Sequence, residues 1–271
     1  MVTVAKDRCN KRTKEKSAWR MEHSHPHYSY GDCPYPIRQG LSDAYKAYWQ
    51  SLAEPGNWFT GAERVAIAAE VRNALVCPFC ETRKSALSPY ALEGEHLKGD
   101  VLKDEFVDAV HRIITDQARI TQSYIDSNTA IGFSEEQYVE LVSVAVTVFS
   151  IDEFNRALGL PVESLPEPIA GEPNHYRPAI TERQTAFVSM IPPDGAVGKD
   201  ADLWQKGKTA NVLRALSLVP EGVRGWMKVA DQQYLSMEGM MNFTGPNGRA
   251  INRMQIELIA GRVSSINECF Y

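Results

Sequence analysis

The sequence predicts an all-helical fold, and two observations carry this prediction. Helix-favouring segments open with capping boxes, in which a Ser or Thr is followed three residues later by Glu or Gln; Thr60 with Glu63 and Ser134 with Gln137 fit this pattern. Glycine and proline then end or separate the segments. With 271 residues, the chain is also long enough to bury a core that needs no disulfide or metal to hold it together.

Seven segments favour helix. Before them, residues 1–40 are polar, are broken by proline and glycine, and are predicted to form an extended arm. Seven prolines fall between Pro161 and Pro193, which predicts a linker or a wrapping segment, because helices and central strands tolerate proline poorly. The predicted helices span Ser42–Leu52, Thr60–Val76, Lys103–Ile114, Ser134–Leu158, Thr209–Leu218, Glu221–Leu235 and Asn252–Asn267.

One of these segments gives conflicting signals. Between Leu141 and Phe149, valines recur at every second position, which is typical of a β-strand by period and by β-branching. The cap at Ser134 and the exit at Gly159 and Pro161 favour a helix instead. The local residues alone leave both structures open.

Charge and hydropathy exclude several classes of protein. Lysine and arginine number 29 against 34 acidic residues, so the chain lacks the positive excess of a protein that binds nucleic acid or an anionic membrane. The basic N-terminal segment has no apolar core of a secretion signal. The longest uncharged apolar stretch, Leu141–Ile151, is about half of a membrane helix. We therefore expect a soluble, cytoplasmic protein.

The sharpest chemical feature is the sequence Cys77-Pro78-Phe79-Cys80, directly after a predicted helix. If a new helix starts here, Cys77 takes the N-cap and Pro78 the first helical position, where its missing amide hydrogen is no loss. Free backbone amides then lower the thiol pKa of Cys77, and Lys84 adds positive charge. Such a dithiol can react with an oxidant at one sulfur and resolve the product as a disulfide with the other.

Two other interpretations of this pair are possible: it could form half of a zinc site, or the thiols could be buried and purely structural. Zinc normally takes four ligands, and the remaining cysteines, Cys9, Cys33 and Cys269, are scattered and supply no second C-x-x-C. An odd total of five cysteines also does not indicate a disulfide framework. The redox interpretation is therefore favoured, and we expect no metal.

The histidines give weaker signals. His96 and His111 could relay protons, because a thiol peroxidase needs a base and an acid for its leaving group, but a surface position or a satisfied hydrogen bond in the core is the commoner situation. His23, His25 and His27 alternate in the N-terminal arm and could bind a transition metal. Histidines in loops are more often solvated, so no metal site is predicted there.

A family resemblance adds to these signals. The C-x-x-C follows a helix that carries glutamates, and a later helix opens after GFSEE at 132–136 and ends in FNRALG at 154–159. Through these motifs, residues from about Trp58 to Pro161 resemble the carboxymuconolactone decarboxylase and alkylhydroperoxidase D superfamily, and most of all its alkylhydroperoxidase-related proteins and selenoproteins. The resemblance implies a helical unit, and it favours a helix for the valine-rich stretch.

A second, partial copy is similar to the family's approach to its active site, in NVLRALS at 211–217, QIELIA at 255–260 and NECFY at 267–271. The resemblance implies a second centre at Glu257 and Cys269, with the family's partner cysteine and histidine expected after Tyr271, as a recoded stop codon would give. Twelve residues of straight helix rise about 18 Å, so Glu257 and Cys269 meet only if the chain turns between them. The implied parts are an arm and helix at 1–57, an alkylhydroperoxidase-like domain at 58–161, a proline-rich linker at 162–205 and a partial second unit at 206–271.

The first unit departs from the family pattern at two positions. The family's histidine, four residues after the second cysteine, is replaced by Lys84, and the family's glutamate position falls on Val65. Glu70 is a nearby candidate, seven residues before Cys77, or about 10 Å along a helix. A water molecule or Lys84 would then have to bridge Glu70 to the thiol.

Together these observations predict a thiol-dependent peroxidase or disulfide reductase with Cys77 and Cys80 as its redox pair. A lowered pKa at the N-cap favours Cys77 as the attacking thiol, whereas the resemblance implies that Cys80 attacks, so the two roles stay open. Two alternatives are a lyase or decarboxylase-like enzyme, which needs no dithiol, and a non-enzymatic protein that holds zinc or a partner. The expected partners are a peroxide or disulfide substrate and a thiol reductant protein, with no cofactor, nucleic acid or membrane. By resemblance, we expect a homo-oligomer.

Overall fold

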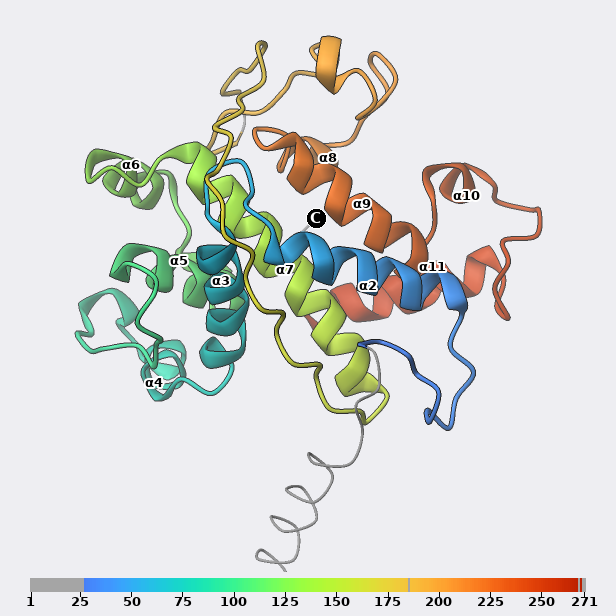
Figure 1. Ribbon diagram of the computed structural model, residues 1–271, viewed down its shortest axis with the longest axis horizontal. Helices are drawn as coiled ribbons and strands as arrows, with labels where there is room; N and C mark the ends of the chain where they lie inside the picture. Colours follow the sequence, from blue (N-terminus) through green and yellow to red (C-terminus); the bar gives the residue numbers. More distant parts are fainter. Residues whose placement is uncertain (1–26, 185, 268, 270–271) are drawn as a thin grey trace, which may run out of the picture.

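The computed structural model describes residues 27–184, 186–267 and 269, so Cys9, His23 and His25 lie outside it. The fold is all-helical, as predicted: the described residues form ten α-helices, and their only β-type pairing is an isolated bridge between Glu182 and Met190. Three short 3-10 turns accompany the helices. The helices (Figure 1) are α2 (Gln39–Ala53), α3 (Gly61–Ala74), α4 (Pro78–Ser85), α5 (Asp104–Thr115), α6 (Gln122–Ala130), α7 (Glu135–Ala157), α8 (Asn211–Arg214), α9 (Pro220–Gln233), α10 (Met237–Met241) and α11 (Arg253–Ile266).

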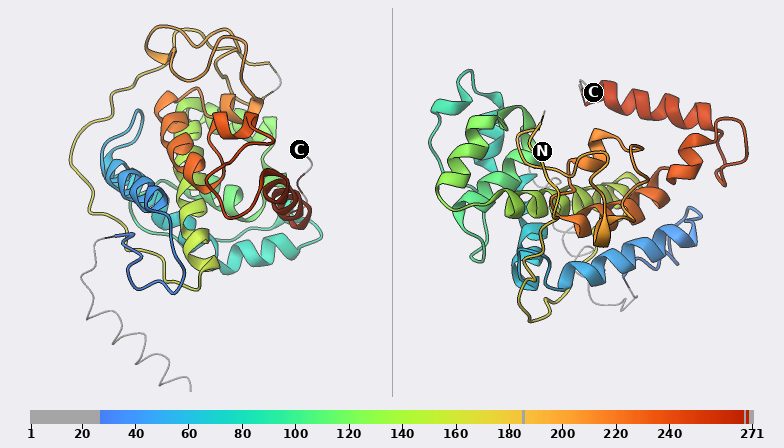
Figure 2. Two further views of the ribbon diagram at one scale, coloured as in Figure 1. Left: turned by 90° about the vertical axis from the view of Figure 1, so that its right-hand side faces the viewer. Right: turned by 90° about the horizontal axis from the view of Figure 1, so that it is seen from above.

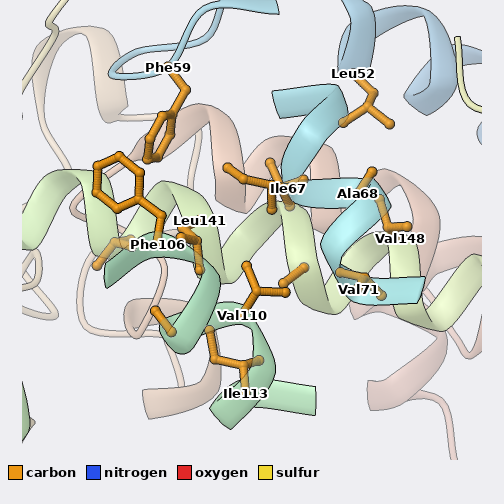
Figure 3. Packing of buried hydrophobic residues seen from close by; sticks show 14 of the residues in the cluster. Leu52, Phe59, Ile67, Ala68, Val71, Phe106, Val110, Ile113, Leu141 and Val148 are labelled. Carbon is orange, nitrogen blue, oxygen red and sulfur yellow. The ribbon is translucent and has the colours of Figure 1, made fainter. Parts of the chain in front are cut away.

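The main core lies around α7, the longest of these helices. On one side α7 packs against α3 and α5, which also pack against each other, and on another side it packs against α9, which in turn contacts α2. Burying one large aliphatic side chain in such a core contributes roughly 1.5–3 kcal/mol to stability. Side chains that meet between α3, α5 and α7 (Figure 3) include Ile67, Ala68, Val71, Phe106, Val110, Ile113, Leu141 and Val148.

The valine-rich stretch belongs to α7 and is helical. Val144 and Val148 are four residues apart, so they share one face of the helix, and both are buried in the main core. Val142 and Val146 form a second such pair on the nearly opposite face, where they are partly buried. The alternation is therefore two helical stripes on nearly opposite faces of α7, both packed against hydrophobic side chains. The predicted capping box at Ser134 is present as well.

Two irregular segments wrap the helices. Near the N-terminus, Tyr28 is completely buried and stacks edge-on against Trp49 of α2. The proline-rich segment after α7 runs along the outside of α2 and α3 (Figure 1), where Trp49 donates a hydrogen bond to the Ser164 carbonyl at 2.8 Å. Farther on, the Ile169 amide donates to the Ala53 carbonyl at 2.8 Å. The segment thus lies against the ends of α2 and α3, in the manner of a wrap.

The C-terminal part is only partly as predicted. The expected helix at 209–218 is reduced to α8, and α10 is a short helix that the sequence did not indicate, as is α6 in the middle of the chain. Leu218, Val219 and Val229 join the main core, because α9 packs on α2 and α7. In the other views (Figure 2), α11 lies along the outside of the molecule. Within the described chain, we find no helix with the length and apolar character needed to cross a membrane.

Candidate functional site

The site is built around the start of α4. Cys77 is the N-cap of this helix with an extended backbone, and Pro78 occupies the first helical turn, as the sequence predicted. Cys80, one turn later, points to the same side, so that both sulfur atoms lie within one group of atoms no more than 4.8 Å apart. Both thiols are buried, with 2% exposure at Cys77 and 3% at Cys80. The structure therefore brings the two cysteines of the C-x-x-C together.

Cys80 is connected to Glu70 through a histidine. The Nδ1 atom of His111, on α5, lies 3.1 Å from the sulfur of Cys80, and its Nε2 atom lies 3.2 Å from Oε2 of Glu70, on α3. The other carboxylate oxygen accepts hydrogen bonds from the Gly99 amide at 2.7 Å and from the Asn73 side chain at 3.2 Å. His111 is completely buried. It takes the bridging position that the sequence analysis gave to water or to Lys84.

A second histidine contacts both thiols from the loop between α4 and α5. The Nδ1 atom of His96 lies 3.4 Å from the sulfur of Cys80 and 3.8 Å from that of Cys77. Its Nε2 atom lies 3.2 Å from Oδ1 of Asp108, on α5. The Leu97 amide, next in the loop, donates to the Cys77 sulfur at 3.3 Å. This loop therefore supplies two of the groups that surround the dithiol.

Arginine side chains fix Asp108 in place. Arg112 donates to its Oδ2 atom at 2.5 Å and Arg83, on α4, donates to Oδ1 at 3.1 Å. The Arg83 guanidinium also stacks over the ring of Phe79, the residue directly before Cys80, at 4.2 Å from the ring centre. The basic residue of α4 that supports the site is thus Arg83, one position before the predicted Lys84.

These contacts favour the charged forms of the site. Burial raises the pKa of the Cys80 thiol, but the hydrogen bonds and positive charge of His111 and His96 outweigh it and lower the pKa to about 5. Burial also raises the pKa of Cys77, and the amides of Cys80 and Leu97 more than offset it, so that this pKa falls as well. Near neutral pH, Cys80 is therefore a thiolate.

The pKa values of the two histidines, in contrast, are raised. Burial lowers the pKa of His111, but its hydrogen bonds to Cys80 and Glu70 raise it to about 9. Burial also lowers the pKa of His96, but its hydrogen bonds to Asp108, Cys80 and Cys77 together outweigh burial and raise the pKa to about 10. The pKa of Asp108 is lowered: burial opposes this, and the hydrogen bonds from His96 and Arg112 overcome it. The site therefore holds imidazolium donors that face a thiolate.

The remaining predicted residues lie away from this cluster. Lys84 is exposed on α4. Glu257 bonds to Tyr234 and, at 2.8 Å, to Arg253, on α11. That helix runs on to Ile266, about 13 Å beyond Glu257, so no turn brings the exposed Cys269 back to it. In Figure 1, α4 and α11 lie in different regions of the molecule. The structure thus does not assemble a second centre from Glu257 and Cys269.

The same cluster has the composition of a metal site. Cys77, Cys80, His96 and His111 each offer one ligand atom, and these four atoms all lie within 4.8 Å of one another. The sequence offers no second pair of cysteines, and the two further ligands are histidines from distant segments. His27, the described member of the alternating histidines, instead lies 3.3 Å from Glu163.

Sequence reasoning considered His96 and His111 as proton relays but favoured an ordinary structural role for both. Asp108 was missed. The signal that could have found it is the spacing of Asp108 and His111, which are three residues apart and therefore share the face of α5 that packs toward α3 and α4.

Comparisons with known proteins add no further constraint. No protein-family model matches the chain, and no curated protein or solved structure is significantly similar to it. The resemblance to the alkylhydroperoxidase D superfamily therefore stays a prediction, and any function has to be argued from the site itself.

Proposed function

We propose that this protein is a thiol-dependent peroxidase that acts through Cys77 and Cys80, the first of the two activities that the sequence predicts. The observation that carries the proposal is the hydrogen-bonded series from Glu70 through His111 to Cys80. A nucleophile, a base in contact with it and a third group that orients the base form the general arrangement of an activated nucleophile. The burial of both thiols favours a hydroperoxide, whose reactive oxygen is terminal, over the second activity, the reduction of a bulky disulfide.

The contacts support Cys80 as the attacking thiol. Its thiolate attacks the terminal oxygen of a hydroperoxide, so that a sulfur–oxygen bond forms and the oxygen–oxygen bond breaks. The leaving alkoxide takes a proton from the imidazolium of His111, which Glu70 holds in place through Nε2. The products are an alcohol and a sulfenic acid on Cys80. A depressed pKa keeps the thiolate available for this step over a wide range of pH.

Cys77 is placed to resolve the intermediate. Its sulfur receives the Leu97 amide hydrogen bond at 3.3 Å, which stabilises a thiolate there. Attack on the Cys80 sulfur forms the disulfide, breaks the sulfur–oxygen bond and releases water. Two thiols and one hydroperoxide have then become a disulfide, an alcohol and water. A thiol reductant, expected to be another protein, returns the disulfide to the dithiol.

The test is the consumption of cumene hydroperoxide by the reduced protein, with dithiothreitol as the reductant. Cys80→Ser should abolish both turnover and the first oxidation. Cys77→Ser should abolish turnover but still allow one round of oxidation, which leaves a sulfenic acid that dimedone traps on Cys80.

Matched controls are Cys33→Ser and Cys269→Ser, since neither thiol belongs to the site. Both variants should turn over at the native rate. The proposal is wrong if the native protein consumes no more peroxide than dithiothreitol alone, or if Cys80→Ser retains the native rate.

A further inference from the structure

The dithiol site has a second chemical capacity that peroxide reduction does not use. Four potential ligand atoms converge there: the sulfurs of Cys77 and Cys80 and the Nδ1 atoms of His96 and His111. With zinc bonds of about 2.3 Å to sulfur and about 2.0–2.1 Å to nitrogen, neighbouring ligands of a tetrahedral ion lie about 3.3–3.8 Å apart. Three of the four sulfur–nitrogen distances in the structure are 3.1, 3.4 and 3.8 Å, and all four ligand atoms lie within 4.8 Å of one another.

The surroundings of the histidines also match those of metal ligands. A histidine that binds a metal through one ring nitrogen usually donates the proton of its other nitrogen to a carboxylate, which fixes the tautomer and the ring orientation. Here both imidazoles have this arrangement, because Nε2 of His96 lies 3.2 Å from Asp108 and Nε2 of His111 lies 3.2 Å from Glu70. Both Nδ1 atoms are therefore turned toward the sulfurs.

Charge and burial lead to the same inference. Three of the four residues are buried and His96 is partly buried, so an ion bound there would be largely shielded from water. Two thiolates neutralise the charge of a divalent cation, and a mixed sulfur and nitrogen donor set of four suits Zn²⁺. The amide of Leu97 already donates to the Cys77 sulfur, as it would to a metal-bound thiolate.

We propose that the reduced protein binds one Zn²⁺ ion through Cys77, Cys80, His96 and His111, and that this ion and the disulfide exclude each other. The sulfurs that hold the ion are the ones that the peroxide oxidises. In the coupled reaction, the zinc dithiolate, a hydroperoxide and two protons give the disulfide, free Zn²⁺, an alcohol and water. This exclusion rests on the proposed function, whereas the binding of the ion does not.

The experiment uses the full chain, reduced and stripped of metal, and titrates it with Co²⁺, whose absorption reports both tetrahedral geometry and thiolate ligation. One equivalent should bind and give an intense sulfur-to-cobalt charge-transfer band, and one equivalent of Zn²⁺ should displace it. Asp108→Asn keeps all four ligands and should weaken binding by about 10–100-fold. Cys269→Ser is the matched control and should bind as the native chain does.

Peroxide then separates the two proposals. Adding cumene hydroperoxide to the zinc-loaded protein should release one equivalent of Zn²⁺ to a chromogenic chelator as the disulfide forms. If the native protein binds no Co²⁺ or Zn²⁺ but still turns over peroxide, the zinc site is refuted and the peroxidase stands. If the disulfide forms while the ion stays bound, the exclusion is refuted. If the ion binds but peroxide forms no disulfide even in the metal-free protein, the proposed function fails and the zinc site alone remains.

Discussion

The substitution Glu70→Gln tests whether the carboxylate acts on Cys80 through His111. Glutamine keeps the shape of Glu70 and can still accept the Gly99 amide hydrogen bond of 2.7 Å. It removes the negative charge that helps to raise the pKa of His111 to about 9. Because the pKa of His111 falls, its imidazolium form is less favoured, and the Cys80 thiolate loses part of its stabilisation. The pKa of Cys80 should therefore rise from its native value of about 5.

The size of the effect follows from the distances. A charge in direct contact shifts a pKa by about 1–3 units, and Glu70 acts on Cys80 at one remove, through His111, so we expect about one unit. One unit corresponds to about 1.4 kcal/mol. At pH 5 the thiolate fraction then falls from about a half to about a tenth, roughly a fivefold loss, whereas at pH 7 both proteins keep more than about 90% thiolate.

The assay is the rate of alkylation of Cys80 by iodoacetamide in reduced, metal-free protein, measured by peptide mass spectrometry between pH 4 and 8. A peptide map identifies the modified cysteine, and the shape of the pH profile does not depend on how accessible the thiol is. Glu63→Gln, on the same helix but in the capping box, is the matched control. An unchanged or lowered midpoint in Glu70→Gln would refute the relay.

Three further predictions concern the stability of the fold and the role of Cys269. Leu141→Ala removes a fully buried side chain of α7, opens a cavity in the main core and should lower the free energy of unfolding in urea by about 2–5 kcal/mol; a loss below about 1 kcal/mol would contradict the packing described here. Ser134→Ala removes the α7 cap and should cost about 1 kcal/mol in the same assay, while exposed Ser85→Ala should cost much less. Cys269→Ser should leave peroxide-driven loss of the two site thiols unchanged, and a slower loss would return Cys269 to the site.

Local signals made much of the fold predictable. The starts of α3, α4 and α7 follow from caps and from proline at the first turn, which depend only on neighbouring residues. The valine-rich stretch was ambiguous because α7 is covered on several sides, so that a helix with two buried stripes has the same alternation as a strand. The cap at Ser134 favours the helix, and the packing of α3, α5 and α9 around α7 shows why both stripes are apolar.

The site was less predictable, because its geometry depends on contacts between distant segments. Cys77 and Cys80 are close in sequence and were found as a pair. His111 reaches Cys80 across 31 residues, and it does so because α5 packs beside α3 and α4. His96 depends on the fold of an irregular loop, for which no periodic signal exists. The sequence also does not show which basic residue of α4 faces the site. Positive charge was expected from Lys84, whereas Arg83 is the residue that contacts Asp108 and Phe79.

The most direct test of the central claim is a thiol count and disulfide map after one equivalent of cumene hydroperoxide is added to the reduced native protein. We expect the loss of two thiols and a single disulfide between Cys77 and Cys80, with Cys33 and Cys269 still free. A protein that keeps all of its thiols, or that forms its first disulfide through Cys269, would contradict the claim that this buried dithiol is the reactive centre.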